Sequence, residues 1–211
     1  MGTLQVPETA LWGAQTQRAV DNFQISNLRM PREFVSALAL IKCSAAQVNS
    51  ELGALDPRLA RAIEVAARSV AAGDFADQFP VDVFQTGSAT SSNMNANEVI
   101  ARLAMQALGT PVHPNDHVNL GQSSNDVVPT AIHVSASLLV SEQLLPGLRH
   151  LHATLTHKIE EIGSIVKTGR THLMDAMPIT FGQELGGWAQ QIESTMSRLD
   201  DALKRMRQLP I

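Results

Sequence analysis

The sequence predicts a mainly α-helical protein, with an N-terminal helical domain that leads into long helices of a central bundle, incomplete at the C-terminal end. Several segments repeat apolar residues at steps of three and four, the period of an amphipathic helix. There is no tyrosine and only 4% of residues are aromatic, so aliphatic side chains must build the core, which favours helix-on-helix packing. One segment keeps the helical period for roughly 40 residues, beyond the usual ~8–20. The 211 residues fit two domains, which we place at 1–119 and 120–211.

The first domain is expected to start with an irregular arm and to continue with three helices. Residues 1–30 have mixed polarity and favour an extended arm or loop. A helix is expected from Pro31, which a first turn tolerates, to Gly53, and a second from about Arg58 to Ala72. Two further segments complete the domain: 79–84 is a candidate extended stretch, and the polar tract 85–97 merges into a helix that ends near Leu108–Gly109.

The second domain is expected to consist mainly of two long helices. After a connection at 110–119, the helical period runs from about Asn125 to Ile162. Pro146 lacks the N–H that a helix interior needs and is expected to kink this helix. A loop at 163–178 follows, and a further helix is expected from Ile179 to Leu209.

Composition and charge exclude several classes of function. Sixteen basic residues stand against twenty acidic ones, with no basic run, so no nucleic-acid partner is expected. No apolar stretch approaches the ~20 residues that span a membrane. A single cysteine, Cys43, fits a reducing compartment, and the first residues resemble no secretory signal. We therefore expect a soluble, cytoplasmic protein without a membrane partner.

Three polar stretches rich in small residues are expected to lie just before helices. They are Thr86–Asn95, Gly121–Asp126 and Thr168–His172. Hydroxyls, amides and backbone N–H groups at a helix N-terminus form a ready site for an anion. Helix capping is the alternative for each stretch alone, because Ser, Thr and Asn are preferred caps. Three such stretches, one of them carrying a histidine, favour a shared carboxylate-binding site.

These stretches closely resemble motifs of the fumarase/aspartase superfamily. Gln85–Ile100 (QTGSATSSNMNANEVI) is similar to a signature of that superfamily. Three further motifs follow in the order and spacing of class II fumarases: His113–Asn119, Gln122–Asp126 and Gly169–Asp175. Leu11–Arg18 also resembles the corresponding stretch of those enzymes, so the resemblance covers essentially the whole chain.

The resemblance implies a homotetramer with a central bundle of long helices and active sites built from three subunits. It implies the reversible addition of water to fumarate, giving (S)-malate, in the tricarboxylic acid cycle, with no cofactor and no metal. His172 matches the histidine that helps to activate the catalytic water. The residues that match ligands of the substrate carboxylates are Ser88, Thr90, Ser123, Ser124, Asn125 and Thr171. A second, shallower dicarboxylate site is matched by His113, Asn115 and Asp116.

Fumarase is favoured over aspartate ammonia-lyase. His172 stands where aspartases usually have Gln, and Gln122–Asp126 has the fumarase form. Three residues depart from the pattern: Ala89 replaces a usual Gly, Met174 a usual Gln and Met177 a usual Thr. Ala89 would strain its loop if the position needs a positive φ. These departures leave open a non-catalytic helical pseudoenzyme or interaction module.

The 211 residues do not contain a further loop that class II fumarases carry. This mobile loop has the form Gly-Ser-Ser-x-Met-Pro-x-Lys-x-Asn and supplies the serine base together with a Lys and an Asn. We therefore expect the chain to correspond to the N-terminal half of a fumarase and to have little or no activity alone. Its helices from residues 125 and 179 should expose apolar faces, so the isolated chain is expected to self-associate.

A metal site is the remaining alternative for His113 and His117. They lie four residues apart with Asp116 between them, and on a helix this spacing would put both imidazoles on one face. Pro114 and Asn115 favour a turn instead, so no metal is expected.

Overall fold

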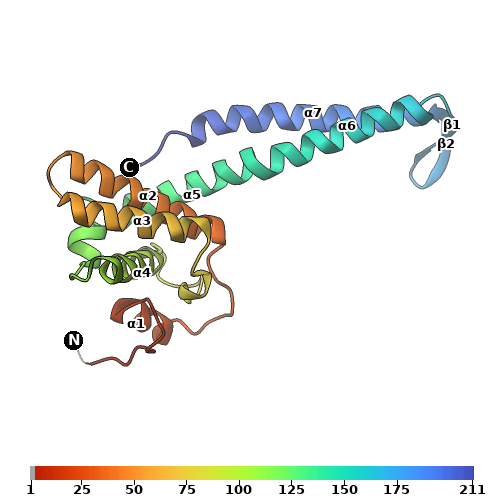
Figure 1. Ribbon diagram of the computed structural model, residues 1–211. Coiled ribbons are helices and arrows are strands. Elements are labelled where there is room, and N and C mark those ends of the chain that lie inside the picture. The colour runs from red at the N-terminus through yellow and green to blue at the C-terminus, as the bar shows by residue number, and fades with distance from the viewer. Residues whose placement is uncertain (1–2) are drawn as a thin grey trace. The chain divides into compact units, whose positions relative to one another are not determined.

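The computed structural model describes residues 3–211, which form seven α-helices, short 3-10 and π-helical turns, and one two-stranded sheet (Figure 1). The mainly α-helical fold class is confirmed. The described chain divides into two compact units. The first runs to Ala136 and includes Leu209–Ile211, and the second is Ser137–Gln208. The domain boundary after residue 119 stays a prediction.

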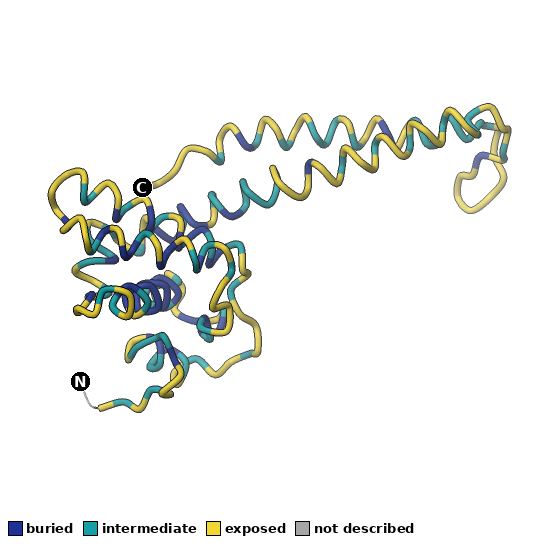
Figure 2. Tube along the Cα trace, in the orientation of Figure 1, coloured by how far each residue is buried: buried dark blue, intermediate teal, exposed yellow. Residues whose placement is uncertain are grey.

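The first unit is built around three helices, α2 (Arg32–Glu51), α3 (Pro57–Ala72) and α4 (Thr90–Leu108). It also contains α1 (Ala14–Asn22), the 3-10 turn η1 (Ala76–Gln78), the π-helical turn η2 (Pro114–Val118) and most of α5 (Ser124–Leu139). Small and branched aliphatic side chains form the core between these helices. Figure 2 shows the buried residues of the chain in dark blue. Fully buried members include Ala37, Leu38, Ile63, Ala67, Val99, Ile100 and Ala104.

The predicted limits of α2, α3 and the end of α4 are confirmed within a few residues. Asp56 caps α3, because its carboxylate accepts the N–H groups of Arg58 and Leu59 at 2.8 and 3.2 Å. Gly73 and Gly109 follow the last turns of α3 and α4 with φ of +96° and +69°, the left-handed conformation that commonly ends a helix. These caps act within a few residues, which is why the sequence shows them.

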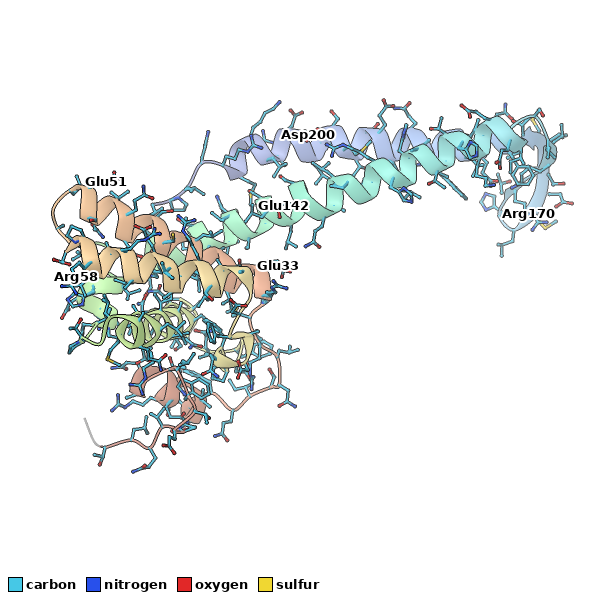
Figure 3. All side chains as sticks on the ribbon, in the orientation of Figure 1. Glu33, Glu51, Arg58, Glu142, Arg170 and Asp200 are labelled. Atoms are coloured by element: carbon cyan, nitrogen blue, oxygen red, sulfur yellow. The ribbon has the colours of Figure 1, made fainter. Side chains whose placement is uncertain are left out.

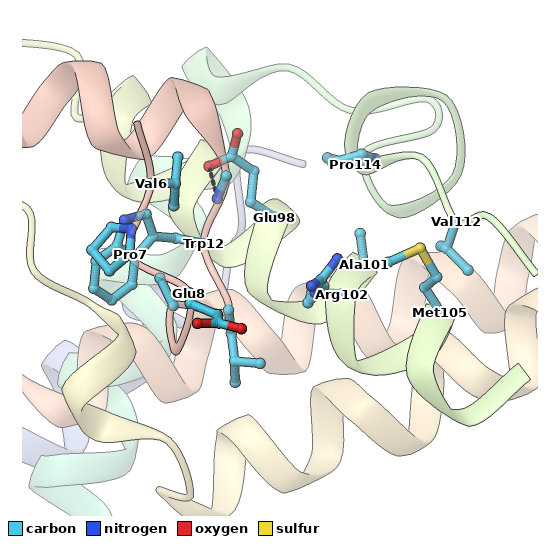
Figure 4. A pocket seen from close by; sticks show the side chains of 13 residues that line it. Val6, Pro7, Glu8, Trp12, Glu98, Ala101, Arg102, Met105, Val112 and Pro114 are labelled. Atoms are coloured by element: carbon cyan, nitrogen blue, oxygen red, sulfur yellow. Dashed lines mark hydrogen bonds between the residues drawn. The ribbon is translucent and has the colours of Figure 1, made fainter. Parts of the chain in front are cut away.

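The prediction of an irregular arm over residues 1–30 is wrong at α1. The carboxylate of Glu98, on α4, accepts the N–H groups of Gly13, Gln15 and Thr16 at 2.9, 3.0 and 3.0 Å. It therefore caps α1 across more than 80 residues of chain, a contact that no local pattern reveals. Figure 4 shows Glu98 in the wall of a cavity of about 420 Å³ that Trp12 also lines.

The candidate extended stretch at 79–84 forms no strand, and its last two residues, Val83 and Phe84, lie in a turn. The structure has one isolated β-bridge at this point, between Arg29 and Asp82. The buried carboxylate of Asp82 instead organises a turn, because it accepts the N–H groups of Ser26 and Phe84 at 2.5 and 2.8 Å. Burial raises the pKa of Asp82, but these hydrogen bonds outweigh it and hold the pKa below its ordinary value.

The second unit is a pair of antiparallel helices joined by a β-hairpin. Helix continues from α5 through a π-helical turn, η3 (Val140–Leu144), into α6 (Leu145–Ile162). The predicted long helix is therefore confirmed, and its irregularity lies directly before Pro146. Since Pro146 has no N–H to donate, a π-helical turn there absorbs the missing bond. The last helix, α7 (Phe181–Met206), begins with a capping box between Thr180 and Gln183.

The prediction of a loop over residues 163–178 is wrong. Strands β1 (Val166–Thr171) and β2 (Met174–Thr180) pair antiparallel there. The two residues between them, His172 and Leu173, have φ of +51° and +60°, as a two-residue hairpin turn requires. Such turns usually contain Asn or Gly, so this sequence gives no hairpin signal.

Side chains of the second unit are mostly exposed. Of residues 137–208, four are buried: Leu145, Gly169, Ala189 and Leu203. Figure 3 shows charged side chains, including Glu142, Asp200 and Arg170, projecting from its helices and hairpin. None of the helices described between residues 3 and 211 is both long and apolar enough to cross a membrane.

Candidate functional site

The first polar loop ends at the N-terminus of α4, as predicted. Gln85 and Ser92 brace it from the core, with Gln85 Nε2 donating to Ser92 Oγ at 2.7 Å and Ser92 N–H donating to Gln85 Oε1 at 2.9 Å. Ala89 occupies the N-cap position and offers no side-chain acceptor to the first turn. The hydroxyl oxygens of Ser88 and Thr90 lie 2.9 Å apart at this helix end. Gln85 thus caps one N–H of the first turn, and two hydroxyls beside this helix N-terminus suit a carboxylate.

The second polar loop leads into α5, which begins at Ser124. The Gln122 N–H donates to the carbonyl of Asn119 at 3.0 Å, which closes a tight turn. The Asn125 N–H donates to Ser123 Oγ at 3.2 Å. Ser123 and Asn125 are exposed and Ser124 is half-buried, so the three side chains are available to a ligand at this helix start.

Asn93 joins the two loops within the first unit. It lies in the first turn of α4 and is buried. Its Nδ2 donates to Ser124 Oγ at 3.0 Å and to Asn119 Oδ1 at 3.3 Å. Its Oδ1 is buried and has no hydrogen-bond partner among residues 3–211. The first turn of α4 is therefore in direct contact with Ser124 through Asn93.

Lys42 lies beneath the second loop. It is on α2, its exposed fraction is 0%, and its Nζ donates to Asn119 Oδ1 and Gln122 Oε1, each at 2.8 Å. Burial lowers the pKa of Lys42 to about 7, because a low-dielectric environment disfavours the charged form. Lys42 is not among the site residues predicted from the sequence. The available signal was a charged side chain four residues after Leu38, on the apolar face of a helix.

The segment that carries His113, Asn115 and Asp116 is exposed. It forms the turn η2, with Asp116 N–H donating to His113 Nδ1 at 3.1 Å and His113 N–H donating to His117 Nδ1 at 2.9 Å. Both Nδ1 lone pairs are thus engaged within the turn. Within the described part of the chain, no group of three or more His, Cys, Asp or Glu side chains is placed to hold a metal ion.

Thr171 and His172 lie in the second unit, at the tip of the β-hairpin. Both side chains are exposed. The third polar stretch therefore does not precede a helix, and the prediction of a helix N-terminus there is wrong. Met174 and Met177, the two departures from the family pattern, lie on β2 with exposed fractions of 69% and 80%.

Comparison with known proteins places this chain among lyases. A model of the lyase family matches residues 2–211. A class II fumarate hydratase of Xylella fastidiosa is 62% identical over 211 residues, which are all of this chain and 45% of that protein. A second relative, named fumarate hydratase class II 2, from Pseudomonas aeruginosa, is 56% identical over 99% of this chain and 46% of its own length.

A solved structure shows the same fold. The class II fumarase of Schistosoma mansoni superimposes with a TM-score of 0.91 at 40% identity, over 97% of this chain and 44% of that one. The chain thus spans a little less than half the length of the relatives it matches. It belongs to the lyase family, and the relatives it resembles there are the class II fumarate hydratases.

Proposed function

We propose that this chain takes part in the reversible hydration of fumarate to (S)-malate, as part of a class II fumarate hydratase. The observation that carries the proposal is its 62% identity, across all 211 residues, to a protein of that name. The polar loops of the first unit support it, because Asn93 links the helix that starts at Thr90 to Ser124.

The chemistry suits the residues of these loops. Removing a proton next to a carboxylate moves negative charge onto that carboxylate, so the site needs fixed donors aimed there. We assign this role to neutral groups on Ser88, Thr90, Ser123, Ser124, Asn125 and Thr171. They hold the two carboxylates without the reorganisation that water would need.

His172 is assigned to the activation of water. The ring nitrogen of a neutral imidazole can accept a proton from water, as a general base must. The exposed group of His113, Asn115 and Asp116 is assigned to a second dicarboxylate site. We further propose a homotetramer with active sites shared between subunits, located in the cytoplasm.

The test is a chimera in which residues 1–211 of this chain replace the matching residues of the Xylella fastidiosa relative. We expect the chimera to hydrate fumarate, and the decrease in fumarate absorbance measures this activity. His172→Asn should lower its kcat by about 100-fold or more, the usual contribution of a general base. Ser36→Ala, a change on α2 whose hydroxyl bonds Ala71, is the control and should leave kcat unchanged.

Three outcomes would contradict the proposal or the expected need for a serine loop outside residues 1–211. A folded chimera that leaves fumarate unchanged would indicate a non-catalytic module. A chimera that releases ammonia from aspartate would indicate an ammonia-lyase. Near-normal hydration by residues 1–211 alone would show that the serine loop expected from the family is not needed.

A further inference from the structure

Lys42 makes an unusual use of a buried amine. Both of its hydrogen-bond acceptors, Asn119 Oδ1 and Gln122 Oε1, are neutral amide oxygens. They belong to the two ends of the turn that precedes Ser123. A buried lysine is costly unless its donors find acceptors, and here Nζ donates to a residue at each end of that turn.

The contact with Nζ decides which way the two amides face. Since the amine donates, each amide turns its oxygen to Lys42 and its NH2 group to the backbone of the turn. Asn119 Nδ2 then donates to the Gln122 carbonyl at 3.1 Å, and Gln122 Nε2 donates to the Val118 carbonyl at 3.0 Å. The two amide oxygens therefore connect the turn to helix α2, and the two amide NH2 groups bond to backbone carbonyls of the same segment.

The same amide oxygen also connects the turn to α4. Asn119 Oδ1 accepts from Lys42 Nζ at 2.8 Å and from Asn93 Nδ2 at 3.3 Å, and the same Asn93 Nδ2 donates to Ser124 Oγ at 3.0 Å. Any rotation of the Asn119 amide would put an NH2 group against two donors. The position of the Ser124 hydroxyl is thus coupled to Lys42 through two side chains.

We propose that Lys42 is a positioning residue: from beneath the loop 119–125, it orients the amides of Asn119 and Gln122 and so places Ser123, Ser124 and Asn125 for a carboxylate ligand. This inference rests on the proposed function only for the identity of the ligand. The ordering of the loop can be measured without it.

The first measurement uses the chimera, with Lys42→Met and Gln122→Met made singly and together. Methionine keeps the unbranched shape of each side chain and removes the hydrogen bond. Lys42→Met loses its bonds to Asn119 and Gln122, and Gln122→Met loses the Lys42 bond and the bond to the Val118 carbonyl. We expect each single change to raise KM for fumarate roughly tenfold or more, with kcat changed less than about twofold. Because the two side chains share the Lys42–Gln122 bond, their effects on KM should be less than additive in the double variant.

The second measurement uses residues 1–211 and no substrate. Hydrogen exchange should be at least about tenfold faster at the Gln122 and Val127 amides in Lys42→Met. The acceptors of these two N–H groups, the carbonyls of Asn119 and Ser123, lie in this loop. Ser36→Ala, on the same helix, is the matched control and should change neither KM nor exchange at these amides. If Lys42→Met does not fold, Gln122→Met, which alters a half-buried side chain, decides both measurements.

The outcomes separate the two proposals. An inactive parent chimera overturns the proposed function, while hydrogen exchange still decides the role of Lys42. Unchanged exchange at Gln122 and Val127 in folded Lys42→Met and Gln122→Met overturns the positioning role. Additive effects of the two changes on KM would also overturn it.

Discussion

Ala89 holds a backbone conformation that suits glycine. It has φ of 50° and ψ of 25° at the N-cap of α4, so the condition under which the sequence predicts strain is met. A Cβ in the left-handed region costs roughly 1–2 kcal/mol. The surrounding contacts, including the Ala89 N–H bond to the Thr86 carbonyl at 2.9 Å, must hold it there.

Ala89→Gly is therefore expected to stabilise the chain. Relief of the left-handed strain should exceed the added entropy of the unfolded glycine, for a net gain of about 0.5 kcal/mol. The free energy of unfolding in urea measures it. Ala107→Gly is the matched control, because Ala107 is exposed within the same helix, where glycine should cost about 0.5–1 kcal/mol. Loss of stability in both variants would contradict the assigned strain.

Lys42 should make stability depend on pH. Its pKa is about 7 in the folded chain and ~10.4 in an unfolded one, so between these values the unfolded chain binds more protons. The free energy of unfolding must then rise with pH, by about 2 kcal/mol from pH 7.5 to 9. The gain is absent below pH 7, where both states are protonated. Urea unfolding of the parent and Lys42→Met at both pH values measures it. An equal rise in both proteins would contradict the assignment to Lys42.

At the scale of elements, the sequence predicts what local contacts determine. The limits of α2, α3 and α7 follow from periodicity together with caps such as Asp56 and the Thr180–Gln183 box. The two missed elements depend on other causes. Helix α1 takes its cap from Glu98, far along the chain, and the hairpin turns at His172–Leu173, where side-chain pattern carries no turn signal.

The hairpin depends on a glycine that its partner strand crowds. A Cβ at Gly169 would lie 2.6 Å from the Met177 carbonyl oxygen, and the register shifts between Thr168 and Arg170. Gly169→Ala should therefore lower the stability of the second unit by about 2 kcal/mol. Gly186→Ala is the control, since Gly186 lies in the second turn of α7 and a Cβ there meets nothing within 4 Å, and it should add up to about 1 kcal/mol.

Amide exchange along β1 and β2, together with thermal unfolding, measures both variants. Gly169→Ala should speed exchange in both strands, whereas Gly186→Ala should leave it unchanged. Equal melting temperatures for Gly169→Ala and the parent would show that the strands move apart at no cost.

At the scale of the whole molecule, the sequence indicates candidate site residues but not the contacts that position them. The motif residues are visible because they lie in polar stretches between apolar helices. Their supports are not, because Lys42 and Asn93 act on Asn119, Gln122 and Ser124 across 26 to 80 residues along the chain. The site residues also divide between the two units, with Ser88, Thr90 and Ser123–Asn125 in the first and Thr171 and His172 in the second.

The second unit should drive self-association of residues 1–211. It buries few side chains and exposes large apolar ones, including Leu151 at 46% on α6 and Trp188 at 52% on α7. Exposed apolar surface on paired helices is expected to pack against further helices.

Sedimentation velocity over a range of concentrations should show oligomers, and Leu151→Glu or Trp188→Glu should raise their dissociation constant by about tenfold or more. Leu52→Glu is the matched control, since Leu52 is 75% exposed but belongs to the first unit, and it should leave association unchanged. A monomer at every concentration, or equal weakening by all three changes, would contradict an assembly surface on α6 and α7.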